Sequence, residues 1–340
     1  MRILIIGGTQ FIGPHVVKEL TAGGHEVMVF HRGKSQAELP SGVRTLLGDR
    51  QRLGEYREAF QVFAPQVVLD MIPFSEADAR TLVEVFSGIA SRVVAISSMD
   101  VYRAYGRLIG AEPGPPEPLP LTEESPVREK LYPYRGEQLR PSDDPQRWMD
   151  EYDKIPVERV VLGQPDLPGT VLRLPAVYGP GDRQHRLFPY LKRMDDGRPV
   201  ILLDEQTAAW RWSRGYVEDV ASAIAAAVVS ERAAGQIYNV GEDQALSEAE
   251  WVRAIGRAAG WSGEVVTVPE ERLPAHLNFG ADTRHALVAG TQKIRRELGY
   301  REKLDRQEAL RRTVAWERAN PPETVDPQAF DYAAEDAAIR

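Results

Sequence analysis

The residues with the clearest chemical use stand at the start of the chain, where glycines follow a short apolar run. Residues 3–6 are apolar, as in a strand buried on both faces, and residues 11–20 have the pattern of a helix. Backbone N–H groups at such a strand–turn–helix junction face a pyrophosphate, and the helix dipole favours its charge. The junction therefore predicts a phosphate site lined by Gly7, Thr9, Gln10, Phe11, Ile12 and Gly13. Gln10 departs from the dinucleotide fingerprint, which has a glycine there.

The end of the next expected strand, residues 26–30, indicates which dinucleotide would bind. An acid at this point holds a ribose 2′-hydroxyl, whereas an arginine suits a 2′-phosphate. Here His31 and Arg32 follow the strand and no acid is present. We therefore favour NADP over NAD, the alternative being that these residues form a solvated basic turn.

Further strands are expected at residues 43–47, 66–71, 92–96 and 170–174, with helical stretches such as 55–63 and 76–90 between them. This alternation predicts right-handed βαβ units and a Rossmann-type, doubly wound parallel sheet. Ligands bind such sheets beyond the carboxyl ends of the strands. The residues at these ends are predicted to line the cofactor site: Asp49, Arg50, Met71, Ile72, Pro73 and Ser97. Asp49 has a second interpretation, as the cap of the following helix.

The chain divides into three expected parts. Residues 1–174 form the cofactor domain, residues 175–322 are mainly a substrate-binding part with segments returning to the sheet, and residues 323–340 are a tail without a core pattern. Residues 103–147 are an irregular excursion with nine prolines, interpreted as an ordered lid, a surface arm or a partly disordered segment. A helix at 150–162 precedes the last strand of the cofactor domain. In the second part, strands are expected at 200–203, 209–213, 236–240 and 265–268, and helices at 187–194, 218–229, 247–259, 292–298 and 306–319.

Composition narrows the class of protein. The 340 residues contain no cysteine, so neither disulfides nor thiolate metal sites are expected, and the six histidines have no metal-ligand spacing. The net charge of −8 argues against non-specific nucleic-acid binding. No apolar stretch is long enough to span a membrane. We expect a cytoplasmic protein without a cleaved signal peptide and without a metal.

Taken together and in this order, the motifs resemble the extended short-chain dehydrogenase/reductase superfamily, in its NAD-dependent epimerase/dehydratase group. They cover nearly the whole chain: residues 7–13, 48–49, 97–102, 154–158, 173–182, 216–221 and 238–241. The form with Gln10 looks more like an atypical branch that includes chloroplast stem-loop-binding-like proteins.

The resemblance implies a catalytic group in which a tyrosine moves the proton, a lysine four residues later supports it, and a hydroxyl polarises the same substrate oxygen. Ser98 matches the hydroxyl and Lys154 the lysine, but the tyrosine position is Asp150. Asp150 would be an unusual base or simply a helix cap. Tyr152 would point away from Lys154 on a regular helix, unless Pro156 delays the helix start. Other residues that the resemblance brings in are Asp100 for acid–base work and Pro175 and Val177, with Lys154, at the cofactor.

The same resemblance places two basic groups where relatives hold phosphate. They are Arg183 with His185, and Arg211 with Arg214. They suggest a phosphorylated or nucleotide-linked small-molecule substrate. Two hypotheses follow: an NAD(P)-dependent epimerase/dehydratase-like oxidoreductase acting on a nucleotide-sugar or related hydroxyl or carbonyl compound, or a dinucleotide-binding protein that has weak or lost redox activity and acts as a sensor, regulator or RNA-associated factor. A homodimer is expected from the resemblance alone.

Overall fold

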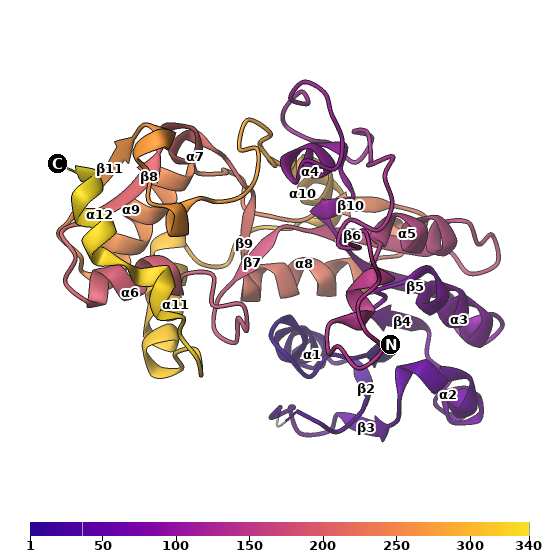
Figure 1. Ribbon diagram of the computed structural model, residues 1–340. Coiled ribbons are helices and arrows are strands. Elements are labelled where there is room, and N and C mark those ends of the chain that lie inside the picture. Colours follow the sequence, from indigo (N-terminus) through magenta and orange to yellow (C-terminus); the bar gives the residue numbers. More distant parts are fainter. Residues whose placement is uncertain (36, 340) are drawn as a thin grey trace.

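The core of the protein is a parallel sheet of seven strands, seen in a computed structural model that describes residues 1–35 and 37–339 (Figure 1). Its strand order is β10-β6-β5-β4-β1-β2-β3, with β1 between β2 and β4. The Rossmann-type sheet predicted from the sequence is confirmed. Its strands are β1 (Arg2–Ile6), β2 (Glu26–His31), β3 (Arg44–Leu47), β4 (Val67–Asp70), β5 (Arg92–Ser98), β6 (Gly169–Leu174) and β10 (Ile237–Asn239).

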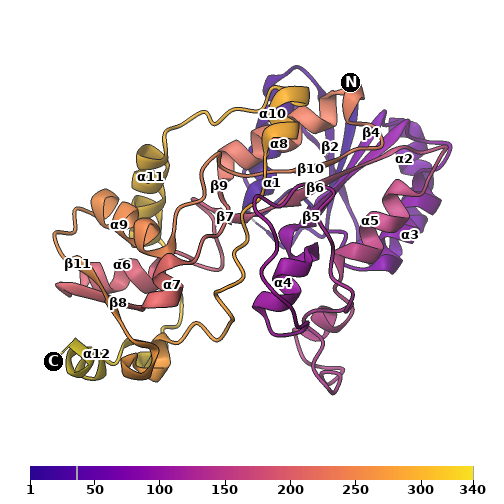
Figure 2. The ribbon, with the colours of Figure 1, turned by 90° about the horizontal axis from the view of Figure 1, so that it is seen from above.

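Helices cover both faces of this sheet (Figures 1 and 2). Alternate residues of β1 show why: Ile3 and Ile5 pack in one apolar cluster, whereas Leu4 and Ile6 pack in another. The first cluster contains the buried sides of α1 (Ile12–Ala22) and α8 (Val217–Val229). The second contains those of α2 (Arg57–Phe63), α3 (Glu76–Phe86) and α5 (Lys154–Leu162).

A smaller lobe, built from the second half of the chain, stands beyond the carboxyl ends of the strands (Figure 2). It contains a parallel pair, β8 (Val200–Asp204) and β11 (Glu264–Val268), and a second parallel pair, β7 (Ala176–Tyr178) and β9 (Arg214–Tyr216), leads into it. Its helices are α6 (Phe188–Asp195), α7 (Glu205–Ala209), α9 (Glu248–Ala259), α11 (Arg306–Ala319) and α12 (Tyr332–Ile339), while α10 (Gln292–Leu298) lies beside β10. In the part of the chain that is described, no helix is long and apolar enough to cross a membrane.

Two expectations in this half were wrong. Residues 209–213 were expected to be a strand, but α7 ends at Ala209 and the strand begins at Arg214. Trp210 N still donates to the carbonyl oxygens of Gln206 and Thr207 at 3.1 Å, so the backbone of α7 extends into the expected strand. The tail was expected to lack a core pattern, yet α12 carries a buried Glu335 that pairs with Arg193 at 2.7 Å. Arg340, the last residue of that tail, lies outside the described residues.

The proline-rich excursion contains α4 (Arg103–Leu108) and then runs irregularly over the carboxyl end of β5. Arg128 anchors it and is only 1% exposed. Its Nε donates to the carbonyl oxygen of Asp100 at 2.5 Å, and its Nη2 donates to Asp153 Oδ1 at 3.0 Å. The excursion is thereby fixed to the segments before and after the site described next.

Candidate active site

The glycine turn has a shape that only glycines permit. Gly7 and Gly8 adopt φ angles of 89° and 79°, in the region that side chains disfavour. A Cβ on Gly13 would lie 2.4 Å from the backbone of Gly8, so the first turn of α1 packs directly on the loop. Phe11, just before α1, has a φ of 46°. The first turn of α1 and the glycine turn are thus packed backbone against backbone.

The end of β2 lies against this turn. Ser35 Oγ donates to Thr9 Oγ1 at 2.7 Å, and the His31 ring accepts a hydrogen bond from Gly33 N at 3.1 Å. Arg32, between them, is exposed. His31 thus shapes the loop, whereas the Arg32 side chain is exposed.

Asp49 and Arg50, which follow β3, both bind other residues of the protein. Asp49 caps the following 3₁₀ turn, its Oδ1 accepting from Gln51 N at 3.0 Å. Arg50 is buried, where it pairs with Asp70 and lies 2.7 Å from Asp78 Oδ1. Burial raises the pKa of Asp70, and the Arg50 charge partly opposes this rise. The Arg50 guanidinium is thus buried against Asp70, at the end of β4, and Asp78. The segment that follows β4 contacts the turn instead: a Cβ on Gly7 would lie 3.4–3.5 Å from side-chain atoms of Met71 and Ile72.

Ser98, Asp100 and Tyr152 converge at the end of β5. Tyr152 Oη donates to Asp100 Oδ2 at 3.0 Å, and Ser98 Oγ accepts from Asp100 N at 3.2 Å. Burial raises the pKa of Tyr152 well above its ordinary value, and the Asp100 charge adds to the rise, whereas a hydrogen bond with Ser98 opposes it. Burial also raises the pKa of Asp100. The phenol is therefore held protonated beside the Asp100 carboxyl group.

Lys154, the first residue of α5, lies next to this group. Its Nζ donates to the carbonyl oxygens of Pro73 at 2.8 Å and Ile96 at 3.0 Å, and lies 5.4 Å from the centre of the Tyr152 ring. Burial lowers its pKa to about 8. An ammonium has three donors, so one remains for a ligand.

The start of α5 explains why Tyr152 reaches the site. The helix was expected to begin near residue 150, but it begins at Lys154, with Asp153 as its cap accepting from Ile155 N at 2.9 Å. Tyr152 therefore lies in non-helical backbone, where the rule that residues two apart point in opposite directions does not apply.

Asp150 is neither beside Lys154 nor the cap of α5. It lies in the 3₁₀ turn Arg147–Asp150, where it is buried and pairs with Arg140 and Arg147. Burial works against its charge, but hydrogen bonds from Arg140 N and the two guanidinium groups outweigh this effect, so its pKa is lowered. A carboxylate whose charge is balanced by two arginines holds the excursion in place and is poorly suited to be a base.

Ser97 points to the other side of β5. Its Oγ donates to Glu158 Oε1 at 2.5 Å, and Glu158 pairs with Arg173 at 2.7 Å, all three being buried. This network ties β5, α5 and β6 together. Val177, in β7, is likewise buried, and Pro175 precedes that strand.

The four basic residues that were expected to bind phosphate are not brought together. Arg183 Nη1 donates to Gln10 Oε1 at 3.0 Å, so this exposed arginine stands at the glycine turn. His185 Nδ1 lies 2.8 Å from Glu317 Oε2, and its ring stacks on Trp316.

The second basic pair is also divided. Arg214 is buried against Glu248. Arg211 is half exposed, with its Nη1 donating to the carbonyl oxygen of Ala245 at 2.8 Å. Of the four side chains, Arg183 and Arg211 are thus the ones exposed to a ligand.

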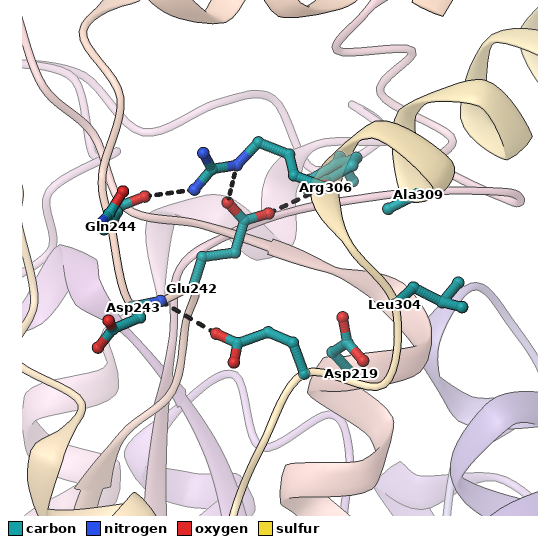
Figure 3. Close-up of a pocket in the computed structure, with 9 residues that line it drawn as sticks. Asp219, Glu242, Asp243, Gln244, Leu304, Arg306 and Ala309 are labelled. Atoms are coloured by element: carbon teal, nitrogen blue, oxygen red, sulfur yellow. Dashed lines mark hydrogen bonds and ion pairs between the residues drawn. The ribbon is translucent and has the colours of Figure 1, made fainter.

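A cavity of about 210 Å³ lies elsewhere, between the starts of α8 and α11 (Figure 3). Its carboxylates already have partners: Arg306 Nε donates to Glu242 Oε2 at 2.7 Å, and Lys303 N donates to Asp219 Oδ1 at 2.7 Å. Burial raises the pKa of Asp219 to about 6. This cavity contains none of the predicted site residues, and its contacts join the two lobes.

Sequence reasoning missed the aromatic wall of the site. Phe74 stacks on Trp148 with ring centres 4.9 Å apart, and Tyr134 donates to Asp100 Oδ2 at 3.1 Å. Tyr105 in turn donates to Tyr134 Oη at 3.0 Å. The available signal was the presence of Tyr132 and Tyr134 in the excursion, and of Trp148 just after it, amid residues that otherwise lack a core pattern.

Sequence comparisons find relatives that are named as reductases. The chain is similar to the 2′-dehydrokanamycin reductase of Streptomyces kanamyceticus, with 28% identity over 80% of this chain and 70% of that protein. It is also similar to a 3-diazoavenalumate denitrifying reductase of a Streptomyces species, with 27% identity over 88% of this chain and 96% of the other.

Among solved structures, the UDP-glucose 4-epimerase of Thermotoga maritima with UDP-glucose has the same fold. The TM-score is 0.68 at 19% identity, covering 94% of this chain and 99% of that one. Residues 3–241 match the family described as the NAD dependent epimerase/dehydratase family. These matches support the enzymatic hypothesis over that of a non-enzymatic nucleotide-binding protein. The chain is a member of the NAD-dependent epimerase/dehydratase family of enzymes.

Proposed function

We propose that this protein transfers hydride between NAD(P)H and a carbonyl group, with Tyr152 as the proton donor to the carbonyl oxygen. The observation that carries the proposal is the convergence of Ser98, Tyr152 and Lys154 at the end of β5, with Lys154 Nζ 5.4 Å from the centre of the Tyr152 ring. When bound, the reduced dinucleotide supplies the hydride. The turn around Gly13, which has no room for a side chain, fits its pyrophosphate.

Each side chain has a distinct task in this scheme. The third N–H of Lys154 holds the cofactor ribose, because its other two donors are used by Pro73 and Ile96. Ser98 and Tyr152 would both bind the substrate oxygen. Burial and the Asp100 charge keep the Tyr152 phenol protonated, which is the form that a proton donor in the reductive direction requires.

The substrate that we propose is a sugar-like ring, nucleotide-linked or free, that carries a ketone or a secondary hydroxyl. The stacked rings of Phe74 and Trp148, with Tyr152 beside them, offer a flat apolar wall edged by hydroxyl groups. The exposed Arg183 and Arg211 support a phosphate-bearing portion. The relatives named as reductases support the reaction type.

A cofactor preference and an assembly state complete the proposal. The exposed Arg32 and the absence of an acid after β2 support NADP over NAD. We also propose a cytoplasmic homodimer, on the family resemblance alone; light scattering of the purified protein tests the dimer.

Paired variants test the assignment of the proton donor. The protein is assayed by nicotinamide absorbance on a panel of UDP-linked and free sugars and their keto forms, UDP-glucose among them. Tyr152→Phe should lower kcat by about 10²- to 10⁴-fold, the range for loss of a general acid, with NADPH affinity nearly unchanged. Asp150→Asn, which alters the position where the family has tyrosine, should leave kcat close to that of the wild type.

Two results would contradict the proposal. Full activity of Tyr152→Phe would remove the assigned donor, and a large loss in a folded Asp150→Asn would return the role to Asp150. Tight NADPH binding by the wild type, without turnover of any compound in the panel, would instead favour a dinucleotide-binding protein without redox chemistry.

A further inference from the structure

The excursion brings a second phenol to the catalytic group. Tyr134 Oη donates to Asp100 Oδ2 at 3.1 Å, the same oxygen that accepts from Tyr152 Oη at 3.0 Å. The rings of Tyr134 and Tyr152 meet edge to face with centres 5.3 Å apart. Tyr105 Oη donates to Tyr134 Oη at 3.0 Å. Three phenols and one carboxylate thus form a continuous hydrogen-bonded chain from Tyr152 to Tyr105.

The chain is held in place by buried contacts. Arg128 bonds the carbonyl oxygen of Asp100 and the side chain of Asp153, so one guanidinium fixes both the carboxylate residue and the start of α5. Asp100 Oδ1 is buried and has no hydrogen-bond partner among the described residues. Both phenols therefore donate to the other oxygen, Oδ2, which favours proton transfer between them. The unpaired Oδ1 lowers the stability of the folded protein.

The lysine is already committed to other contacts. Lys154 Nζ donates to Pro73 and Ile96, which leaves one donor for a ribose hydroxyl. A proton lost from Tyr152 to a substrate needs a route back to that phenol. The chain through Asp100 offers a direct one, and its far end, Tyr105, is only partly buried.

We propose that Tyr134 is a positioning residue that orients Asp100 and relays a proton through it to Tyr152 after each turnover. This inference rests on the proposed function. Tyr152 gives its proton to the substrate oxygen as hydride from the reduced dinucleotide reaches the carbonyl carbon. The O–H bond of Tyr134 then breaks as one forms on Asp100 Oδ2, and that proton passes to the Tyr152 phenolate. Tyr105 reprotonates Tyr134, and water reprotonates Tyr105, so one proton enters for each alcohol formed.

The variants that test the relay differ by single hydroxyl groups. Tyr134→Phe removes the middle of the chain and Tyr105→Phe its far end. Tyr132→Phe is the matched control, because this residue lies in the same loop with its ring 3.9 Å from the Arg135 guanidinium rather than against Asp100. Tyr134→Phe should lower kcat by about tenfold or more, as expected for a disrupted proton transfer, with KM and NADPH affinity within about twofold of the wild type.

Two further measurements separate a relay from a merely structural role. The solvent deuterium isotope effect on kcat should rise in Tyr134→Phe, and the acidic limb of the pH–kcat profile should move to higher pH, because a donor that favours the charged form of Asp100 is gone. The charged and titratable groups that interact with Asp100, and so influence its pKa, are Arg128, Lys154, Tyr152, Tyr134 and, at longer range, Tyr105. Tyr132→Phe should change none of these readouts.

One readout does not depend on turnover. In protein labelled with ¹³C at aspartate carboxyl groups, the Asp100 resonance should titrate at higher pH in Tyr134→Phe than in the wild type or in Tyr132→Phe. A wild type without turnover refutes hydride transfer, yet this titration still tests the contact with Tyr134. The inference is overturned if Tyr134→Phe keeps the wild-type kcat, or if kcat falls while the isotope effect, pH profile and Asp100 titration stay as in the wild type.

Discussion

Replacing Arg128 by methionine should loosen the excursion and the site together. Arg128 is the largest fully buried side chain and donates to the carbonyl oxygens of Asp100 and Lys130 and to Asp153. Its loss leaves two carbonyl groups without this donor and leaves Asp153 with only backbone donors. An unsatisfied buried group costs about 1–3 kcal/mol, and breaking a buried ion pair costs about 3–5 kcal/mol. Because methionine refills part of the volume, we expect a loss of about 4 kcal/mol in the free energy of unfolding.

That loss can be read as a melting temperature. For 340 residues, an unfolding entropy of about 2.1 cal/mol/K per residue converts about 4 kcal/mol into a fall of roughly 6 °C. Calorimetry measures it, and limited proteolysis shows whether residues 103–147 become accessible. Arg80→Met is the matched control, because Arg80 makes an exposed pair with Glu76 and should shift the melting temperature by about 1 °C or less. An Arg128→Met protein that melts and resists protease like the wild type would refute the reasoning.

Two more predictions concern the cofactor. Burial lowers the pKa of Lys154 to about 8, and a negatively charged dinucleotide favours its charged form, so NADPH affinity should fall as pH rises above about 8. Lys154→Arg, which stays charged, should lose this pH dependence. A wild type with constant affinity from pH 7 to 9.5 would contradict the assignment. Arg32→Ala should weaken NADPH binding by roughly tenfold and NADH binding far less, because the exposed guanidinium would contact the 2′-phosphate, which NADH lacks. Equal losses in fluorescence titrations with both cofactors would argue against that contact.

The sheet could be predicted from the sequence because each strand carries its own signal. Runs such as residues 3–6 are apolar at every position, which suits a strand covered on both faces, and glycines mark the turns. Helix caps are equally local: Ser247 and Glu250, three residues apart, form a capping box at the start of α9. Such features depend on neighbours in sequence, so they can be predicted without the fold.

The catalytic group depended on more distant contacts. The position of Tyr152 follows from where α5 begins, and that in turn follows from Asp153, which binds Arg128 across the excursion. Arg214 has the pattern of a phosphate ligand in sequence, but the fold buries it against Glu248. Which charges meet one another is decided by tertiary packing, and a single sequence does not contain that information locally.

The place of β10 in the sheet limits how this enzyme can be divided. β10 pairs with β6 at the edge of the sheet, and α8 covers the same face as α1, although both follow residue 174 in the chain. A fragment ending at 174 would expose the edge of β6 and an apolar face, which are features that promote aggregation. Residues 1–174 are therefore not expected to fold as an independent domain that could be moved to another protein. In fragment complementation, the two pieces should recover a folded protein only when they are produced together.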